Sequence, residues 1–332
     1  MTSRRSVLRF LGYGSAALGA AALLTSGCAR FRTDRAEDDY PPIGEFVDVD
    51  GTQVHYLTKG TGPDLVLIHG AGGNLREFTF DLMDRLTGRY RVTAFDRPGL
   101  GYTGRAPGID THPTATVAET PLQQAQLLRS ASAALGLEAP IVVGHSFGGI
   151  VGYAWAVLDM DDPSPSSASA VVSLAGVALP WPGGLGAYYT VNASAFGGAV
   201  TVPFLSAFVP ESVVTDRITA TFKPQPVPEG YTEHIGARLT LRPDTFRANT
   251  RQVAYLRPHV VELSKRYPEL TLPIEILHGT DDTTVPIDIH SERLVKIIPS
   301  ANLTVMQGVG HMPHHADPQT TIAAIDRAFA RR

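Results

Sequence analysis

The sequence predicts an α/β protein with a mostly parallel central sheet flanked by helices, because short apolar runs alternate with helical segments along most of its 332 residues. The runs are almost continuously apolar, which is typical of strands that are buried on both faces of a parallel sheet. They are residues 65–68, 92–95, 141–143, 171–174, 274–277 and 303–306. A composition that is 43% hydrophobic can supply one large core for this chain length.

The N-terminus predicts an export signal at residues 1–29. Ser3-Arg4-Arg5 precedes a weakly apolar stretch from Phe10 to Leu24, which is shorter than the roughly 20 residues of a membrane span. Paired arginines before such a stretch resemble a twin-arginine signal. That resemblance implies the twin-arginine export machinery as a partner and a final location in the cell envelope, either membrane-anchored, periplasmic or extracellular.

Cys28 is the single cysteine of the chain, so no intramolecular disulfide can form. The residues before it resemble a bacterial lipobox, which implies lipidation of Cys28 and anchoring at a membrane. Thr25 departs from that pattern, because the family has an apolar residue at this position. Simple cleavage near Cys28 and an uncleaved anchor therefore stay open. The charged segment 30–44, which includes Pro41-Pro42, is expected to be a linker.

The expected elements of the fold begin with a hairpin at residues 46–57, where Asp50-Gly51 interrupts an alternating pattern. A capping box at Thr120 and Gln123 predicts a helix that ends at Gly136. A last amphipathic helix is expected from Asp317-Pro318, with Ile322, Ile325 and Phe329 on one face.

The strand rhythm stops between residues 177 and 272, which predicts a largely helical cap inserted between two parts of the sheet domain, 45–176 and 273–332. The segment is rich in glycine, proline and aromatic residues, with a helix-compatible stretch from 245 to 267. Most cap aromatics are expected to form core and about a third to line a substrate site: Trp181, Tyr188, Tyr189, Phe196, Phe204 and Phe208.

Gly144-His145-Ser146-Phe147-Gly148 directly follows one of the apolar runs and precedes a helical segment. A serine held in a sharp turn between strand and helix is exposed for nucleophilic attack, and flanking glycines keep side chains away from the crowded backbone. A serine hydroxyl also needs a general base and a carboxylate that orients the base. Loops after the last two predicted strands supply Asp281, Asp282 and His311.

The order Ser, Asp, His at strand ends makes residues 45–332 resemble the α/β-hydrolase superfamily. The resemblance implies Ser146 as nucleophile, His311 as base and Asp282, in preference to Asp281, as the acid. His69-Gly70-Ala71-Gly72-Gly73 resembles the superfamily's oxyanion loop. That likeness implies the backbone N–H groups of Ala71 and Phe147 as oxyanion donors.

Several polar residues are expected to be structural. Asp96 and Arg97 lie in a turn that is similar to the one after the superfamily's fourth strand. His69 and His278 each precede a glycine at a strand end. His314 and His315 lie near His311 without a metal-binding spacing, so neither a metal nor a cofactor is expected.

The expected function is a serine hydrolase that cleaves a carboxylic ester or related acyl bond of a small molecule through an acyl-enzyme. A cofactor-free haloperoxidase or perhydrolase, a carbon-carbon bond hydrolase and an aminopeptidase use the same residues and stay open. A non-catalytic envelope binding protein is the alternative from another class. The net charge of −4 excludes nucleic acid as a partner, because no basic field would attract it.

Overall fold

A single mixed sheet of eight strands forms the centre of the computed structural model, which describes residues 4–332 and their side chains from residue 19 onward. The order across the sheet is β1-β2-β4-β3-β5-β6-β7-β8. Strands β3 to β8 run parallel, and β2, near one edge, is antiparallel to both of its neighbours, β1 and β4. The strands are β1 Glu45–Val49, β2 Thr52–Lys59, β3 Asp64–Ile68, β4 Arg91–Phe95, β5 Ile141–His145, β6 Ala170–Leu174, β7 Ile274–Gly279 and β8 Ala301–Met306.

The predicted α/β architecture is therefore confirmed. All six predicted apolar runs lie within strands, and those of β3, β5, β6 and β7 are fully buried. The hairpin is also present, with Val49 paired to Thr52 across Asp50 and Gly51. Both turn residues have positive φ, at 50° and 83°, which suits an Asp-Gly pair.

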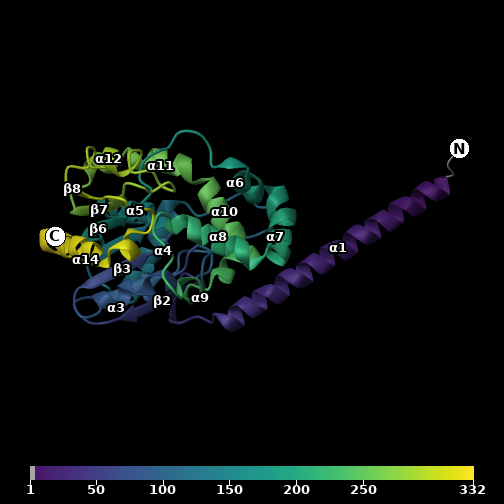
Figure 1. The fold of residues 1–332 in the computed structure, drawn as a ribbon, viewed down its shortest axis with the longest axis horizontal. Coiled ribbons are helices and arrows are strands. Elements are labelled where there is room, and N and C mark those ends of the chain that lie inside the picture. The colour runs from purple at the N-terminus through teal and green to yellow at the C-terminus, as the bar shows by residue number, and fades with distance from the viewer. Residues whose placement is uncertain (1–3) are drawn as a thin grey trace.

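Helices cover both faces of the sheet, as Figure 1 shows. One face packs against α4 and α5, and the other against α3 and α14. Thr120 caps α4 through the predicted reciprocal bonds with Gln123, and Asp317 caps α14 by accepting from the N–H of Thr320. These flanking helices are α2 Arg76–Thr79, α3 Leu82–Leu86, α4 Pro121–Ala134, α5 Phe147–Asp161, α11 Leu256–Ser264, α12 Ser291–Leu294, α13 Pro313–Ala316 and α14 Pro318–Arg331.

A helical layer lies between β6 and β7 in the chain. Its elements are α6 Gly186–Ala193, the π-helical turn η1 Gly197–Thr201, α7 Val202–Phe208, α8 Glu211–Phe222, α9 Tyr231–His234, the 3₁₀ turn η2 Ala237–Leu241 and α10 Pro243–Ala254. We call residues 182–254 the cap. The following helix α11 contributes Val260 and Leu263 to the core beneath α5, as does the 3₁₀ turn η3 Tyr267–Glu269.

The segment expected to be a linker is helical. Helix α1 runs without a break from Arg4–Asp39, and its C-terminal part packs on α7 (Figure 1). Ala29 and Ala36 are buried in this contact region, so small apolar residues every seven positions give the charged helix a face that fits the body. Ser3 and the side chains of Arg4 and Arg5, which carry the predicted twin-arginine motif, lie outside the described residues.

Among the helices whose side chains the structure describes, none alone is long and apolar enough to cross a membrane. Helix α6 and the segment Gly197–Phe208 reach that length and composition only together, and they are bent by 87° at their junction.

Candidate active site

Ser146 lies in a strained turn between β5 and α5. Its φ of 52° and ψ of −114° fall in a region that residues with a side chain seldom occupy. The turn directs the side chain away from the strand and leaves it at the carboxyl edge of the sheet. The predicted elbow is thus present in the backbone.

The two glycines of the pentapeptide are required by their neighbours. A Cβ at Gly144 would lie 2.1 Å from the carbonyl oxygen of Gly148, and a Cβ at Gly148 would lie 2.0 Å from that of Ile68. Both contacts are with backbone, which cannot move aside as a flexible side chain can. Strand β3, the elbow and α5 therefore pack at a distance that only glycine permits.

The structure brings three of the predicted site residues into one hydrogen-bonded line. The Nε2 atom of His311 lies 2.9 Å from the Oγ atom of Ser146. On the other side of the ring, Nδ1 lies 2.7 Å from the Oδ2 atom of Asp282. Because the carboxylate only accepts, Nδ1 carries the proton and Nε2 accepts from the serine hydroxyl.

Asp282 is held in place by several donors, whereas the carboxylate of the exposed Asp281 accepts only from the hydroxyl of Thr280. The N–H groups of Thr284 and Val285 donate to Oδ1 of Asp282, and His278 lies 3.1 Å from Oδ2. Burial raises the pKa of the Asp282 carboxyl, but the hydrogen bonds from His278 and His311 outweigh burial and hold it well below its usual range. Asp282 is therefore an anion beside His311.

Burial lowers the pKa of His311 below its ordinary value, and the nearby Asp282 carboxylate offsets this only in part. The imidazole is consequently neutral at pH 7. A neutral ring that accepts from a serine hydroxyl can serve as a general base.

Ala71 and Phe147 line the same cavity as Ser146. Phe147 is the first residue of α5, so its N–H has no acceptor within the helix. Arg97, which is fully buried, contacts the segments that carry the N–H groups of both Ala71 and Phe147. Its guanidinium donates to the carbonyl oxygen of Gly70 at 3.0 Å and lies 4.2 Å from the centre of the Phe147 ring.

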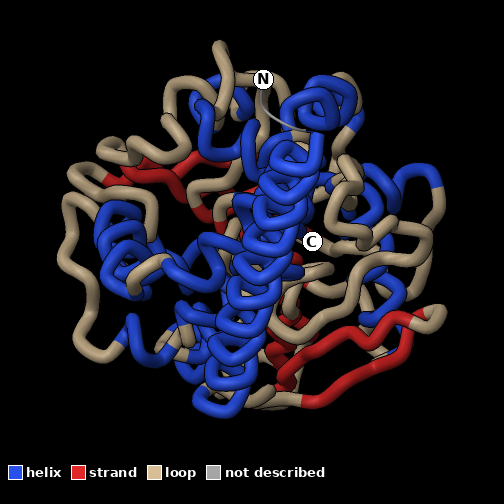
Figure 2. The backbone as a smooth tube through the Cα atoms, turned by 90° about the vertical axis from the view of Figure 1, so that its right-hand side faces the viewer, coloured by secondary structure: helices blue, strands red, loops and turns tan. Residues whose placement is uncertain are grey.

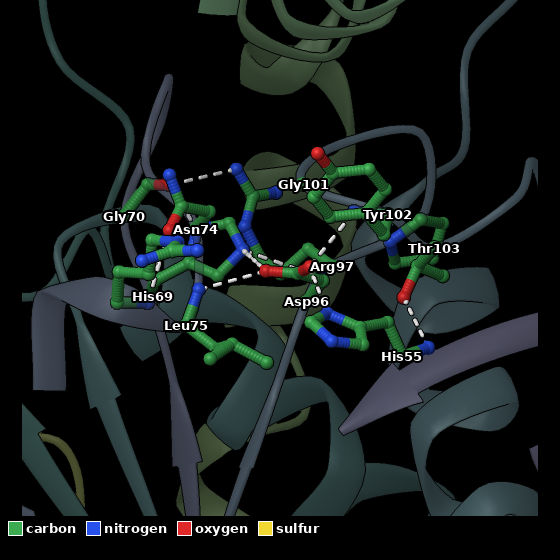
Figure 3. A network of polar contacts seen from close by, with 12 residues as sticks. His55, His69, Gly70, Asn74, Leu75, Asp96, Arg97, Gly101, Tyr102 and Thr103 are labelled. Atoms are coloured by element: carbon green, nitrogen blue, oxygen red, sulfur yellow. Dashed lines mark hydrogen bonds and ion pairs between the residues drawn. The ribbon is translucent and has the colours of Figure 1, made fainter. Parts of the chain in front are cut away.

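Figure 3 shows how the neighbouring Asp96 fixes the loops around this arginine. Its carboxylate accepts from the N–H of Leu75 at 2.7 Å and from that of Tyr102 at 2.8 Å, and it meets Nδ1 of His55 at 2.6 Å. Asp96 is buried, and these donors together with the histidines lower its pKa despite the burial. Asp96 and Arg97 thus have the structural place that the sequence predicts.

An apolar cavity of about 360 Å³ opens beside Ser146. Two predicted cap aromatics, Trp181 and Tyr189, lie in its wall. The other four, Tyr188, Phe196, Phe204 and Phe208, are exposed, so the expectation that most cap aromatics form core is wrong. The remaining apolar lining is Val177, Pro182, Leu185, Val253, Leu256, Val285, Pro286 and Ile289.

A second cavity of about 230 Å³ adjoins the first at Ser146 and Ala71, and a buried ion pair that sequence reasoning missed lies in its wall. Oε1 of Glu77 lies 2.7 Å from Nδ1 of His145, and Nε2 of His145 lies 2.9 Å from the carbonyl oxygen of His311. Both ring nitrogens face acceptors, so both carry protons. Burial opposes that charge, but the Glu77 carboxylate raises the pKa of His145, and the pKa of Glu77 is correspondingly held well below its usual range.

Glu77, His145 and His314 place one potential ligand atom each within 4.8 Å of one another. Two ligands of a tetrahedral zinc ion lie roughly 3.4 Å apart, given bonds of about 2.0–2.2 Å. The 2.7 Å contact of Glu77 with His145 is too short for that arrangement and fits a direct ion pair. His314 is buried, and burial lowers its pKa to about 4, while His315 packs among Phe80, Phe222 and Tyr231.

The other predicted site residue, Cys28, is exposed on α1. His278 and His69 make structural contacts: His278 contacts Ser291, Asp282 and the carbonyl of Val285, and His69 donates to the carbonyl of Gly70 and accepts from the N–H of Arg97.

Comparison with known proteins agrees with the fold. Residues 65–325 match the alpha/beta hydrolase family. A curated relative is the dihydrolipoyllysine-residue acetyltransferase component of the acetoin cleaving system of Cupriavidus necator, which is 39% identical over 145 residues. That match covers 43% of this chain and 35% of the relative, so the chain spans about a third of that protein's length.

Two further proteins align along most of the chain. The pimeloyl-[acyl-carrier protein] methyl ester esterase of Vibrio vulnificus is 26% identical over 81% of this chain and 95% of its own. The crystal structure of an esterase from Rhodococcus sp. superposes with a TM-score of 0.66 at 21% identity, covering 88% of this chain and 100% of that one. With its sheet order, its strand-end residues and a match over most of its length, the chain belongs to the alpha/beta hydrolase family.

Proposed function

We propose that the protein is a serine hydrolase that cleaves carboxylic esters through an acyl-enzyme. The observation that carries the proposal is the line from Ser146 through His311 to Asp282, with contacts of 2.9 and 2.7 Å. Ser146 Oγ attacks the carbonyl carbon while Nε2 of His311 takes its proton, and Asp282 stabilises the imidazolium that forms.

Two backbone donors stabilise the first intermediate. The N–H groups of Ala71 and Phe147 bind the oxyanion, and removing one such donor typically costs about 3–4 kcal/mol in the barrier. The ester bond then breaks, and His311 returns its proton to the departing alcohol. A water molecule, deprotonated by His311, attacks the acyl-enzyme, which releases the carboxylic acid and restores Ser146.

The two cavities that share Ser146 in their walls support a division of the substrate. The larger one is apolar along Trp181, Leu256 and Ile289 and suits an alkyl or aryl acyl group. The smaller one has Glu77 and His145 in its wall and suits a polar leaving group. By its name, the Vibrio relative acts on a methyl ester, which favours the same bond type for this chain.

We also propose that the protein is exported and held at a membrane surface. The support is the sequence pattern of residues 1–29 and the exposure of Cys28 on α1, which leaves its thiol accessible for acylation. The intact mass of the chain purified from membranes tests this. A mass increase located on Cys28 is expected, and an unmodified Cys28 in chain released without detergent would contradict lipidation.

A fluorophosphonate probe tests the proposed chemistry, because it reacts with activated serines. The purified chain is expected to be labelled, Ser146→Ala to be unlabelled, and Ser130→Ala, which changes a serine on α4 far from the cavities, to be labelled like the unmodified chain. Labelling that survives Ser146→Ala would overturn the nucleophile. A folded chain that neither reacts nor turns over any ester in a panel of acyl lengths would support a binding protein instead.

A further inference from the structure

The outer surface of the cap carries an apolar patch that ester hydrolysis does not use. From Pro182 to Pro210 the sequence contains no Asp, Glu, Lys, Arg or His. Several side chains of this segment are nonetheless exposed, Phe196 by 64% and Phe204 by 55%. We define the cap patch as the exposed Tyr188, Val191, Phe196, Val200, Phe204 and Phe208. Clustered exposed apolar side chains mark a contact site for a protein or a membrane.

The cap patch is a shaped surface. Helices α6 and α7 with the turn between them enclose a shallow groove of about 450 Å³, lined by patch residues including Val191, Val200 and Phe204. The rings of Phe204 and Phe208 lie 5.1 Å apart along α7. The groove is therefore open to solvent and almost wholly apolar.

Helix α1 indicates what covers the patch. It packs on α7, and its N-terminal part extends beyond the body on the side where α6 and α7 lie (Figure 1). Figure 2, which faces that side, shows α1 in front of the body, because the helix projects from it toward the viewer. Leu23 and Leu24 of α1 are 77% and 69% exposed, and residues 10–27 contain no charged residue. Cys28, the proposed lipid attachment site, is exposed on the same helix. An uncleaved apolar segment and a lipid on Cys28 would both bring apolar groups to the bilayer along α1, next to an uncharged patch.

A lipid surface fits both features better than a second protein does. Protein interfaces normally surround an apolar centre with a polar rim. The 29 residues from 182 to 210 carry no charge, so this segment has no side chain that could form an ion pair in such a rim. Exposed Tyr and Phe side chains next to an apolar helix are the composition that inserts into the boundary of a bilayer.

The patch also adjoins the cavity beside Ser146. On α6, Tyr188 belongs to the patch, whereas the next residue, Tyr189, lines the cavity. Leu185 at the start of α6 is 37% exposed and lines the same cavity. A single helix therefore separates the patch from the apolar cavity.

We infer that the cap patch docks on a lipid bilayer beside α1 and places the entrance of the Ser146 cavity at the lipid boundary. One consequence rests on the proposed function: esters dissolved in the bilayer would reach Ser146 along an apolar surface. The lipid contact itself is testable without turnover.

Quenching by brominated lipid tests the contact. The full-length chain carrying Phe204→Trp is reconstituted into vesicles of phosphatidylethanolamine and phosphatidylglycerol, with or without brominated acyl chains. Val305→Trp is the matched control, because Val305 is 40% exposed on β8 at the opposite end of the molecule (Figure 1). After subtraction of the unmodified chain, emission at position 204 is expected to fall by about twofold in brominated vesicles, since docked side chains reach the acyl boundary. Equal quenching by brominated lipid at positions 204 and 305 would overturn the inference.

A second readout uses activity. The double variant Phe204→Ser/Phe208→Ser is expected to cut hydrolysis of a long-chain ester embedded in vesicles by at least about tenfold, because two aromatic rings no longer insert. Its hydrolysis of a soluble short-chain ester should change by less than about twofold, because neither ring touches the cavity of Ser146. Equal loss on both esters would count against docking, as would dimerisation in lipid-free solution that the double variant abolishes. If the unmodified chain hydrolyses neither ester, the proposed function fails while the quenching result still decides the lipid contact.

Discussion

The side chain of His145 holds the main chain of His311: its Nε2 atom donates to the carbonyl oxygen of His311 at 2.9 Å. His145 directly precedes Ser146, so one residue links the turn of the proposed nucleophile to the loop that carries the proposed base, His311. Glu77 fixes the same ring from the other side at 2.7 Å. The separation between Ser146 and His311 therefore depends on a buried ion pair that takes no part in proton transfer.

Glu77→Gln should lower kcat for a soluble ester by about 10- to 100-fold, because small displacements of a catalytic base have effects of this size. KM for a methyl ester should change little, since a methyl leaving group makes little use of the cavity that Glu77 lines. Glu233→Gln removes an exposed carboxylate of the cap and serves as the control. A Glu77→Gln variant with unchanged kcat, or one with kcat lowered only because the protein unfolds in circular dichroism, would contradict the positioning role.

Asp282→Asn should reduce kcat by about four orders of magnitude, because the amide favours the wrong tautomer of the base. Asp281→Asn should be nearly neutral, as the carboxylate of Asp281 accepts only from Thr280 at the surface. Steady-state kinetics of the two variants decide the assignment, and the reverse ranking would overturn it.

On the acid side, kcat/KM should fall to half of its maximum at a pH below 6.5, which is the ordinary pKa of histidine. The base works only when it is deprotonated, and burial lowers the pKa of His311, so the ring stays neutral at lower pH. Activity on an ester without ionisable groups gives the profile. If kcat/KM reached half of its maximum above pH 6.5, the effect of the Asp282 carboxylate on the pKa of His311 would outweigh that of burial.

Gly148→Ala should destabilise the fold by about 3 kcal/mol, because the new methyl group meets the Ile68 carbonyl within a packed core. Gly88→Ala is matched to it, since a Cβ at Gly88 has nothing within 4 Å. That control should change stability by less than about 1 kcal/mol. Urea denaturation of both variants provides the comparison, and similar midpoints would show that β3 and α5 can move apart.

Ile289→Trp should shorten the acyl chains that are accepted, since Ile289 lines the apolar cavity of about 360 Å³. Turnover of long-chain esters should fall by more than about tenfold relative to acetate esters. A uniform fall across the ester panel would assign this cavity to another part of the substrate.

The sequence predicts well those features that depend on neighbours in the chain. Asp50-Gly51 specifies its hairpin, Thr120 and Gln123 cap their own helix, and the turn around Ser146 follows from two glycines and the strand before them. The pairing of Asp282 rather than Asp281 with His311 was predicted from the spacing of residues in the α/β-hydrolase superfamily. That spacing is local too, because it is counted from the end of the preceding strand.

Features that depend on distant contacts were not predictable in this way. Glu77 and His145 are far apart in the chain and meet only because α2 lies over the end of β5. The segment 30–44 looks like a linker because it is charged, yet packing of Ala29 and Ala36 extends α1 to Asp39. Tyr188 and Tyr189 have similar sequence surroundings, and only the position of α6 sends one to solvent and the other to the cavity.

The central claim is that Ser146 carries an acyl group during turnover. Mixing the chain with an excess of an activated ester, quenching in acid within milliseconds and mapping peptides by tandem mass spectrometry tests this directly. We predict a mass increase equal to the acyl group on the peptide that contains Ser146, and no such increase in a chain carrying Ser146→Ala. Ester turnover with no acyl group on Ser146 at any quench time, or with the group on another residue, would contradict it.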